Sequence, residues 1–206
     1  MVYFHRVQKD SVMSKADQTR AFIIEKTAPV FNMKGYAGTS LTDMTGVTGL
    51  TKGSIYGNFT NKDEVALAAF DYNLQKVTNI INAEMSGLHS IREKLLVYAR
   101  VYSDFLKLPF PVGGCPILNT AIEADDTHSH LKKKASDAIL SWKNRIMRMV
   151  QTGIESGEFR EGVDPEQTAL TMIAMIEGGI MISKLTGKIN YRNAIMRSVG
   201  ELINQL

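Results

Sequence analysis

The chain has 206 residues, of which 44% are hydrophobic and 22% are charged, so it can bury a core in one large or two small domains. No apolar run approaches the roughly 18 residues of a membrane span, and the first ten residues lack the apolar stretch of a signal peptide. A single cysteine, Cys115, excludes an internal disulfide framework. We therefore expect a cytoplasmic protein without membrane contact.

Charge is distributed unevenly along the chain, whose formal net charge is +3. Residues 1–62 contain eight lysines and arginines and four acidic residues, a net charge of +4, whereas the remainder carries −1. Contacts between basic side chains and phosphates supply most of the sequence-independent affinity of proteins for DNA. The basic excess therefore favours a nucleic-acid partner for the first 62 residues.

The first expected elements are an arm and a helix. Residues 1–13 show no helical period and are expected to form a flexible arm or an extension. Apolar residues at spacings of three and four then predict a helix from Ser14 to Lys34, with Gly35 as its C-terminal stop. Pro29 lies inside this helix and is expected to kink or divide it.

A helix-turn-helix unit is predicted within residues 39–64. Leu41, Met44 and Val47 recur at helical spacing and are expected to bury one face of a short first helix. Gly49 can make the sharp turn because glycine adopts left-handed backbone angles without a side-chain clash. Such a short helix is unstable alone, so the unit must pack on a larger core.

The second helix of this unit is expected over residues 52–59, with Thr51 as its N-cap. Ile55 and Phe59 lie four residues apart and are expected to face inward. The outward groups are of types that contact phosphates and base edges, namely Thr51, Lys52, Gly53, Ser54, Tyr56, Gly57 and Asn58. The competing interpretation is that these polar groups are merely solvated.

This segment resembles the helix-turn-helix of the TetR family of bacterial repressors. That family typically has a turn glycine, a short helix ending in Tyr-x-x-Phe, and a lysine that opens the following long helix. Gly49, Tyr56, Phe59 and Lys62 stand in those places, whereas Thr45 stands where the family commonly has alanine. The resemblance implies that Tyr56 and Lys62 contact phosphates.

The full set of predicted DNA contacts combines these residues with the start of the first helix of the unit. We expect phosphate contacts from Thr39, Ser40, Thr51, Tyr56 and Lys62. We expect Lys52, Ser54 and Asn58 near base edges, with Gly53 allowing close approach of the backbone.

The rest of the chain is also expected to be helical. A long helix from Lys62 to about Met85 would join the DNA reader to a second block, whose helices are expected over about 90–108, 116–124, 130–156, 165–185 and 191–205. Asp164 before a proline, and Asn190, are the expected N-caps of the last two helices. The prediction is an all-α protein of about nine helices.

This pattern predicts three regions: an arm over 1–13, a helix-turn-helix DNA-binding domain over 14–62, and an effector-binding and dimerisation domain over 63–206. The helix over 168–186 is apolar almost all round, and Gly178 and Gly179 would let two helices approach closely. Burial within one monomer is the competing interpretation. We prefer a homodimer, and the resemblance implies pairing through the last two helices.

The interior of the second block is the expected ligand site. Aromatic, methionine and polar side chains on helices that would face one another are typical of small-molecule pockets, although the same pattern describes an ordinary core. The candidate ligand-binding residues are Tyr98, Tyr102, Phe105, Cys115, Asn119, Glu123, Trp142, Met149 and Met175. Asn119 and Glu123 are the polar pair that would need partners if buried, and an inducer could be one.

Two further features have alternative interpretations. Cys115 precedes a helix, where the helix dipole would lower its pKa, and some repressors similar to this one sense electrophiles through such a cysteine. A small buried apolar group is the alternative and the more common role. His128 and His130 could bind a metal, but their spacing favours a solvated loop, and we predict neither metal nor cofactor.

The sequence thus predicts a one-component transcriptional regulator, a repressor that binds a palindromic operator as a dimer. A small-molecule effector of unknown identity would release it from double-stranded DNA. The alternative is a helical ligand-binding or sensor protein without operator binding. No nucleophile elbow, phosphate-binding loop or catalytic histidine set is present in the sequence, so we do not expect an enzyme.

Overall fold

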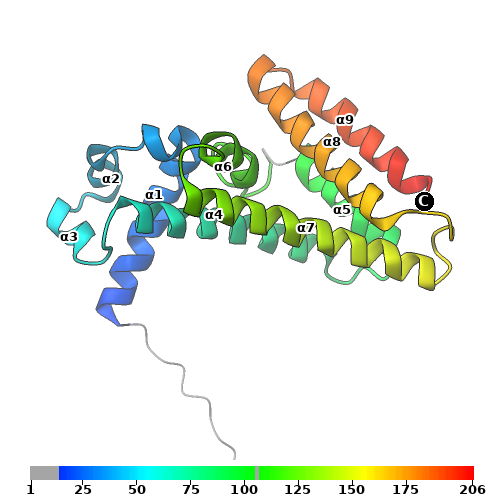
Figure 1. Cartoon of the computed structure of the whole chain (residues 1–206), viewed down its shortest axis with the longest axis horizontal. Coiled ribbons are helices and arrows are strands. Elements are labelled where there is room, and N and C mark those ends of the chain that lie inside the picture. Colours follow the sequence, from blue (N-terminus) through cyan, green and yellow to red (C-terminus); the bar gives the residue numbers. More distant parts are fainter. Residues whose placement is uncertain (1–13, 105–106) are drawn as a thin grey trace, which may run out of the picture.

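The computed structural model describes residues 14–104 and 107–206. These residues form nine α-helices and no β-strand, as predicted (Figure 1). The helices are α1 (Lys15–Gly38), α2 (Leu41–Thr48), α3 (Lys52–Tyr56), α4 (Lys62–Met85), α5 (Ile91–Ser103), α6 (Pro116–Ala124), α7 (Ser129–Glu155), α8 (Pro165–Thr186) and α9 (Ile189–Asn204). The predictions made for residues 1–13 and Phe105 fall outside the described residues.

The helices pack into two hydrophobic cores that share α4. The N-terminal core gathers α1, α2, α3 and the first turns of α4, with Ile23, Met44, Ile55 and Val65 fully buried. The larger core gathers the rest of α4 and the helices α5 to α9. Because α1 packs along α4, the N-terminal helices are attached to a helix that continues into the second block (Figure 1).

The break in α1 lies at Gly35, whereas a kink or division of the helix was expected at Pro29. Gly35 has a φ of 72° and is the residue with non-helical backbone angles inside this helix. Glycine tolerates that left-handed conformation, while the fixed φ of proline is compatible with a helix. Regular helix therefore stops at the predicted glycine, and one more turn reaches Gly38.

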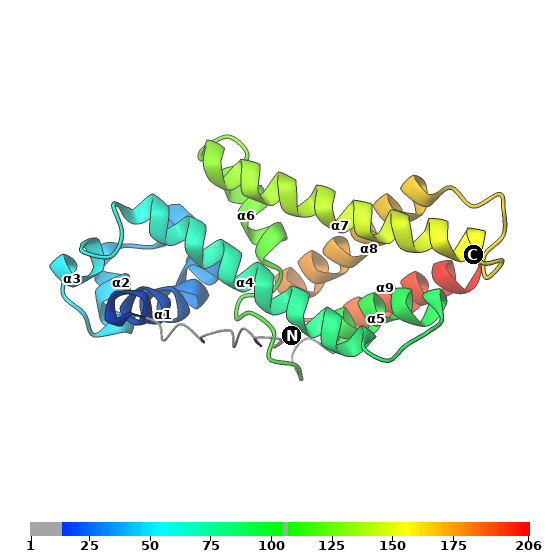
Figure 2. The same ribbon diagram turned by 90° about the horizontal axis from the view of Figure 1, so that it is seen from below.

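Helices α8 and α9 pack side by side, at the end of the molecule away from α2 and α3 (Figures 1 and 2). Among the described helices, α8 alone has the length and composition of a membrane span. Its side chains Ile173, Ile176 and Ile180 are nevertheless buried in the larger core, as in the core helix of a globular protein. Burial in the larger core therefore accounts for part of the apolar character of α8.

Three further helix boundaries differ from the prediction by two residues or more. α3 ends at Tyr56 rather than at residue 59. α5 ends at Ser103 rather than near Leu108, with Asp104 as its C-cap. α9 begins at Ile189 with Lys188 in the cap position, so the expected cap, Asn190, already lies inside the helix. The connection from α8 to α9 is two residues long, and the chain must therefore re-enter a helix at once.

Candidate nucleic-acid interface and ligand cavity

The connection between α2 and α3 has helix-turn-helix geometry. Ser40 caps α2 through reciprocal hydrogen bonds with Asp43. Gly49 adopts a φ of 68°, which confirms the predicted turn glycine. Thr51 caps α3 by accepting a hydrogen bond from the Ser54 N–H at 3.2 Å. These local hydrogen bonds and the turn at Gly49 set the orientation of α3 relative to α2.

The inward face of the unit agrees with the prediction in α3 and differs in α2. Ile55 and Phe59 are buried, although Phe59 lies beyond the end of α3. In α2 the buried residues are Met44 and Thr48, while Val47 is 43% exposed. The reason is helical geometry, since positions three and seven residues apart share a face and positions six apart do not.

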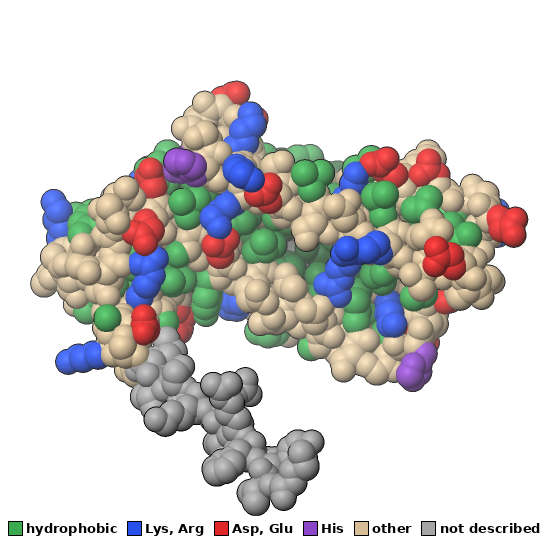
Figure 3. Space-filling model, turned by 60° about the horizontal axis from the view of Figure 1, so that its bottom comes forward, with side chains coloured by type: hydrophobic (Ala, Val, Ile, Leu, Met, Phe, Trp, Pro, Cys, Tyr) green, Lys and Arg blue, Asp and Glu red, His purple; other side chains and the backbone are tan. Residues whose placement is uncertain are grey.

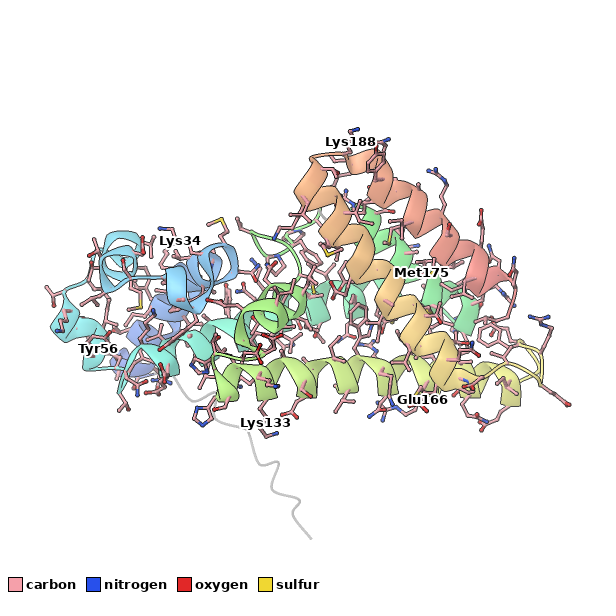
Figure 4. The ribbon with its side chains drawn as sticks, turned by 45° about the horizontal axis from the view of Figure 1, so that its top comes forward. Lys34, Tyr56, Lys133, Glu166, Met175 and Lys188 are labelled. Carbon is pink, nitrogen blue, oxygen red and sulfur yellow. The ribbon has the colours of Figure 1, made fainter. Side chains whose placement is uncertain are left out.

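The outward surface of α3 is formed by small polar groups and one cation. Thr51, Lys52 and Gly53 are exposed, while Ser54 and Tyr56 are partly buried. The helix contains no acidic residue. It lies at one extremity of the molecule, and Tyr56 is seen there in Figure 4, so this surface is open to a large partner.

Thr39 is not available to a phosphate, which corrects its assignment. It is 0% exposed, and its hydroxyl donates a hydrogen bond to the Gly35 carbonyl at 2.6 Å. Ser40 stays exposed, but its hydroxyl donates to Asp43 at 2.7 Å. The Lys34 ammonium, 2.6 Å away, helps to hold the pKa of Asp43 well below its usual range.

The residues around the start of α4 are also engaged within the protein. The Asn58 side-chain amide donates to the Ser54 carbonyl at 2.9 Å. The Lys62 ammonium lies 4.3 Å from the centroid of the Tyr36 ring. The Tyr36 hydroxyl donates to Asp63, and this hydrogen bond raises the pKa of Tyr36 to about 12. Lys62 is thus held beside the N-terminus of α4 by an aromatic ring.

Arg20 is a structural residue of this interface that was not predicted from the sequence. Its guanidinium donates to the Glu64 carboxylate at 2.6 Å and to the Asn58 carbonyl, and it lies 3.9 Å from the centroid of the Phe59 ring. Arg20 therefore joins α1 to the segment between α3 and α4. Because its partners lie about 40 residues away in the chain, no local pattern could have indicated this role.

Charge is mixed on the face of the molecule that Figure 3 shows. On the face shown in Figure 3, lysine and arginine side chains alternate with acidic ones along the whole molecule. Three cations of the N-terminal region pair with carboxylates, namely Arg20 with Glu64, Lys26 with Glu25 and Lys34 with Asp43. On this face, attraction for DNA would therefore come from local cations.

The second block contains a cavity of about 140 Å³ between α4, α5, α6 and α7. Its lining is mostly apolar and aromatic, and comprises Leu74, Val77, Thr78, Ile81, Tyr98, Tyr102, Ile117, Ala138, Ser141, Trp142 and Arg145. The Trp142 ring stacks on Tyr102 at 5.7 Å between centroids and lies 5.9 Å from Tyr98. An apolar cavity with few polar groups is the usual form of a small-molecule site.

Helix α6 connects this cavity to the N-terminal helices. The Glu123 carboxylate accepts hydrogen bonds from the backbone N–H groups of Tyr36 and Ala37, each at 2.7 Å. The Asn119 side chain donates to the Asn32 carbonyl at 3.0 Å. Because Ile117 of the same helix lines the cavity, α6 touches both the cavity and α1.

Comparison with known proteins decides between the possible functions of this geometry. Residues 23–69 match the family described as bacterial regulatory proteins, tetR family, and residues 92–199 match the tetracyclin repressor-like C-terminal domain. The chain belongs to the TetR family. TetR-family members are helix-turn-helix transcriptional regulators, typically repressors that bind operator DNA as dimers and are released by ligands. The predicted family and regulatory function are confirmed.

Similar proteins match most of the length of this chain. A TetR-family regulator from Cytophaga hutchinsonii is 52% identical, covers 95% of this chain and 98% of its own, and superposes with a TM-score of 0.91. A second, from Chloroflexus aurantiacus, is 37% identical, with coverages of 94% and 98% and a TM-score of 0.89. The regulator TtgR of Pseudomonas putida is 27% identical over 80% of this chain and 79% of its own.

The structure of this TetR-family protein separates the predicted ligand residues into groups. Tyr98, Tyr102 and Trp142 line the cavity. Asn119 and Glu123 do not, because their polar groups form hydrogen bonds with α1. Met149 and Met175 pack against the larger core without lining the cavity, and Phe105 lies outside the described residues.

Cys115 has the predicted position at the start of α6 but the opposite electrostatic environment. Burial raises the pKa of its thiol well above the usual value, and the nearby Glu177 carboxyl adds to this rise. The N–H groups at the start of α6 act in the predicted direction and are outweighed. The Cys115 thiol donates to Glu177 at 2.9 Å, and burial raises the pKa of Glu177 to about 7. The predicted low pKa was wrong.

His128 has a structural role at the start of α7. Its Nδ1 accepts a hydrogen bond from the Leu131 N–H at 3.2 Å, so His128 is the N-cap of this helix. Its ring packs edge-on against Tyr36 at 4.5 Å between centroids. Within residues 14–104 and 107–206, no three histidine, cysteine or acidic side chains are grouped as metal ligands would be.

Proposed function

We propose that α3 enters the major groove of the operator while the cavity between α4, α5, α6 and α7 receives the effector. The observation that carries this proposal is the double attachment of α6, which lines the cavity through Ile117 and holds α1 through Glu123. A ligand that displaces α6 would therefore move the DNA-binding helices. In this proposal the boundary between the DNA-binding domain and the effector-binding domain is at Lys62, although Val65 and Ala69 of α4 complete the N-terminal core.

The DNA contacts of this proposal are those that the structure leaves accessible. Lys52 and Ser54 on α3 would reach base edges, and Asn58 would do so only by leaving its bond to Ser54. Thr51, Tyr56 and Lys62 would bind phosphates on either side of the groove. Ser40 would add a phosphate contact at the exposed start of α2. Gly53 would allow the backbone of α3 to approach the DNA closely.

The proposed dimer forms through α8 and α9. Exposed or partly exposed residues form an uncharged stripe along α8 at spacings of three and four, namely Ala174, Gly178, Met181, Ile182 and Leu185. Leu185 is 81% exposed in the monomer, an arrangement that favours burial by a partner. Such a two-fold dimer would present two α3 helices to half-sites about one helical turn apart.

The two adjacent glycines of α8 have different roles in this proposal. A Cβ at Gly179 would lie 3.0 Å from the Met196 side chain, so Gly179 allows α8 and α9 of one monomer to pack closely. A Cβ at Gly178 would meet nothing within 4 Å. Gly178 is therefore the position that would admit a helix of the partner subunit.

The proposal is tested by filling the cavity. Ala138 lies on its wall, and Ala138→Leu adds three carbon atoms there, whereas Ser136→Leu adds a leucine at an exposed site on the same helix. The operator is first selected from the DNA upstream of the coding region or from a random library. A small-molecule panel is then screened for compounds that release it.

We expect the Ala138→Leu protein to bind operator like the wild type but to resist release, while the Ser136→Leu protein is released normally. Thermal unfolding of both variants checks the fold, because overpacking costs about 1–3 kcal/mol. Release of the Ala138→Leu protein at wild-type ligand concentrations would contradict the cavity as effector site. Failure to select any operator would contradict α3 as a DNA reader.

A further inference from the structure

The cavity wall offers hydrogen-bond donors that have no partner in the described part of the chain. These are the Tyr98 hydroxyl and the Trp142 indole N–H, both completely shielded from solvent. Their side chains are 1% and 9% exposed and line the cavity. A buried polar group without a partner is destabilising, so native proteins seldom retain one without a function or a bound molecule. Two such groups in one cavity wall point to a ligand that supplies acceptors.

The same wall carries a cation without a counter-ion. The Arg145 guanidinium donates to the Asn82 side-chain oxygen at 2.7 Å and contacts the Met85 sulfur at 3.3 Å. No carboxylate lies within 4 Å of it among the described residues. The lining of the cavity contains no aspartate or glutamate. An anionic group on a ligand would therefore find a positive charge and no repulsion from the wall.

The two ends of the aromatic wall differ in charge. Burial raises the pKa of the Tyr98 hydroxyl to about 12. Arg145 is close enough to Tyr98 for its positive charge to oppose this rise. Tyr102 instead lies beside Cys115 and Glu177, which together with burial raise its pKa well above 10.0. A ligand anion would consequently be placed at the Tyr98 end, away from the Glu177 carboxyl.

We propose that the effector is a small organic acid with a flat apolar body, whose carboxylate is bound by Arg145 and Tyr98. This inference rests on the proposed function, in which the cavity is the effector site. The volume of about 140 Å³ suits a single ring, since an apolar cavity of about 150 Å³ accommodates benzene. Leu74, Val77 and Ile81 would cover the body, and Trp142 would lie against it and donate to an acceptor.

The test uses three probes with one ring and different charges: benzoate, benzamide and benzylamine. Trp142 is the only tryptophan of the chain, so its fluorescence reports on this cavity alone when the full-length protein is titrated. Isothermal titration calorimetry gives the affinity independently. We expect benzoate to bind at least about tenfold more tightly than benzamide, and benzylamine not to bind.

Three variants locate the carboxylate. Arg145→Gln should weaken the binding of benzoate roughly 10- to 100-fold, and Tyr98→Phe should weaken it roughly 2- to 10-fold. Arg145→Gln should have little effect on the binding of benzamide. Arg148→Gln, an exposed site on the same helix outside this cavity, should leave all affinities unchanged. Thermal unfolding verifies each fold. Since the Tyr98 hydroxyl has no partner in the described chain, Tyr98→Phe should fold even if Arg145→Gln does not.

The outcomes separate the ligand class from the site itself. Equal binding of benzamide and benzoate, with no effect of Arg145→Gln or Tyr98→Phe, would overturn the acid while leaving the cavity as a binding site. Binding of none of the probes to the wild type would also overturn the inference. The Ala138→Leu release experiment would still stand or fall on its own, because its panel is not restricted to acids.

Discussion

The attachment of α6 to α1 makes a quantitative prediction for Glu123→Gln. The carboxylate accepts two backbone hydrogen bonds at 2.7 Å, from Tyr36 and Ala37, with one oxygen each. Glutamine retains a single acceptor oxygen and turns an N–H donor toward the other backbone N–H. The variant therefore loses at least one charge-assisted hydrogen bond, and we expect the free energy of unfolding to fall by about 2 kcal/mol.

Two measurements follow from this loss. For a chain of this length, about 2 kcal/mol corresponds to a fall of about 4–8 °C in Tm. In addition, the effector should weaken operator binding less in the variant than in the wild type, because movement of α6 is transmitted less completely to α1. Asp126→Asn is the matched control, since the Asp126 carboxylate is exposed and its removal should change neither quantity.

The reasoning would be refuted by a Glu123→Gln protein with a wild-type Tm and wild-type release by effector. A lower Tm with unchanged release would show that the contact stabilises the fold without transmitting the signal. Gly35→Ala offers a second approach to the same contact, because a Cβ at Gly35 would overlap the Glu123 carboxylate. Its Tm should fall further than that of Glu123→Gln, because alanine is also strained at a φ of 72°, whereas release by the effector should weaken in the same way.

Three further predictions concern the DNA surface, the dimer and pH. Tyr56→Phe should weaken binding to all operator variants by about 1 kcal/mol, whereas Lys52→Ala should relax preference at one base pair; binding-site selection with each protein checks this. Gly178→Arg should give a folded monomer in analytical ultracentrifugation, while Gly179→Ala should lower Tm and leave a dimer. Glu177, whose pKa rises from 4.5 to about 7 on folding, binds more protons in the folded state, so stability should fall by up to about 3 kcal/mol as pH rises from 4.5 through 7. Glu177→Gln should remove that slope in denaturant titrations, and an unchanged slope would disprove the assignment.

Features decided by neighbours in the chain could be predicted from the sequence. The αL turn at Gly49, the cap at Thr51 and the burial of Ile55 each depend on residues within about one or two helical turns, so local rules suffice. Val47 was wrongly predicted to be buried, because the three-residue spacing was extended to position i+6, which lies on another face of the helix.

Features decided by distant segments could not be predicted in this way. Glu123 was expected to face a ligand, yet its hydrogen-bond partners are backbone groups 86 and 87 residues away. The pKa of Cys115 is raised largely by burial and by Glu177, which lies 62 residues further along the chain. Tertiary contacts outweighed local chemistry at each position.

The central claim is that occupation of the cavity changes the affinity for operator. It is tested by measuring operator binding over a salt titration, with and without a compound that stabilises the wild type but not Ala138→Leu. We predict that the compound lowers affinity by about 5- to 150-fold and makes the salt dependence shallower, because fewer phosphates are contacted. Equal affinity at every salt concentration would contradict the claim.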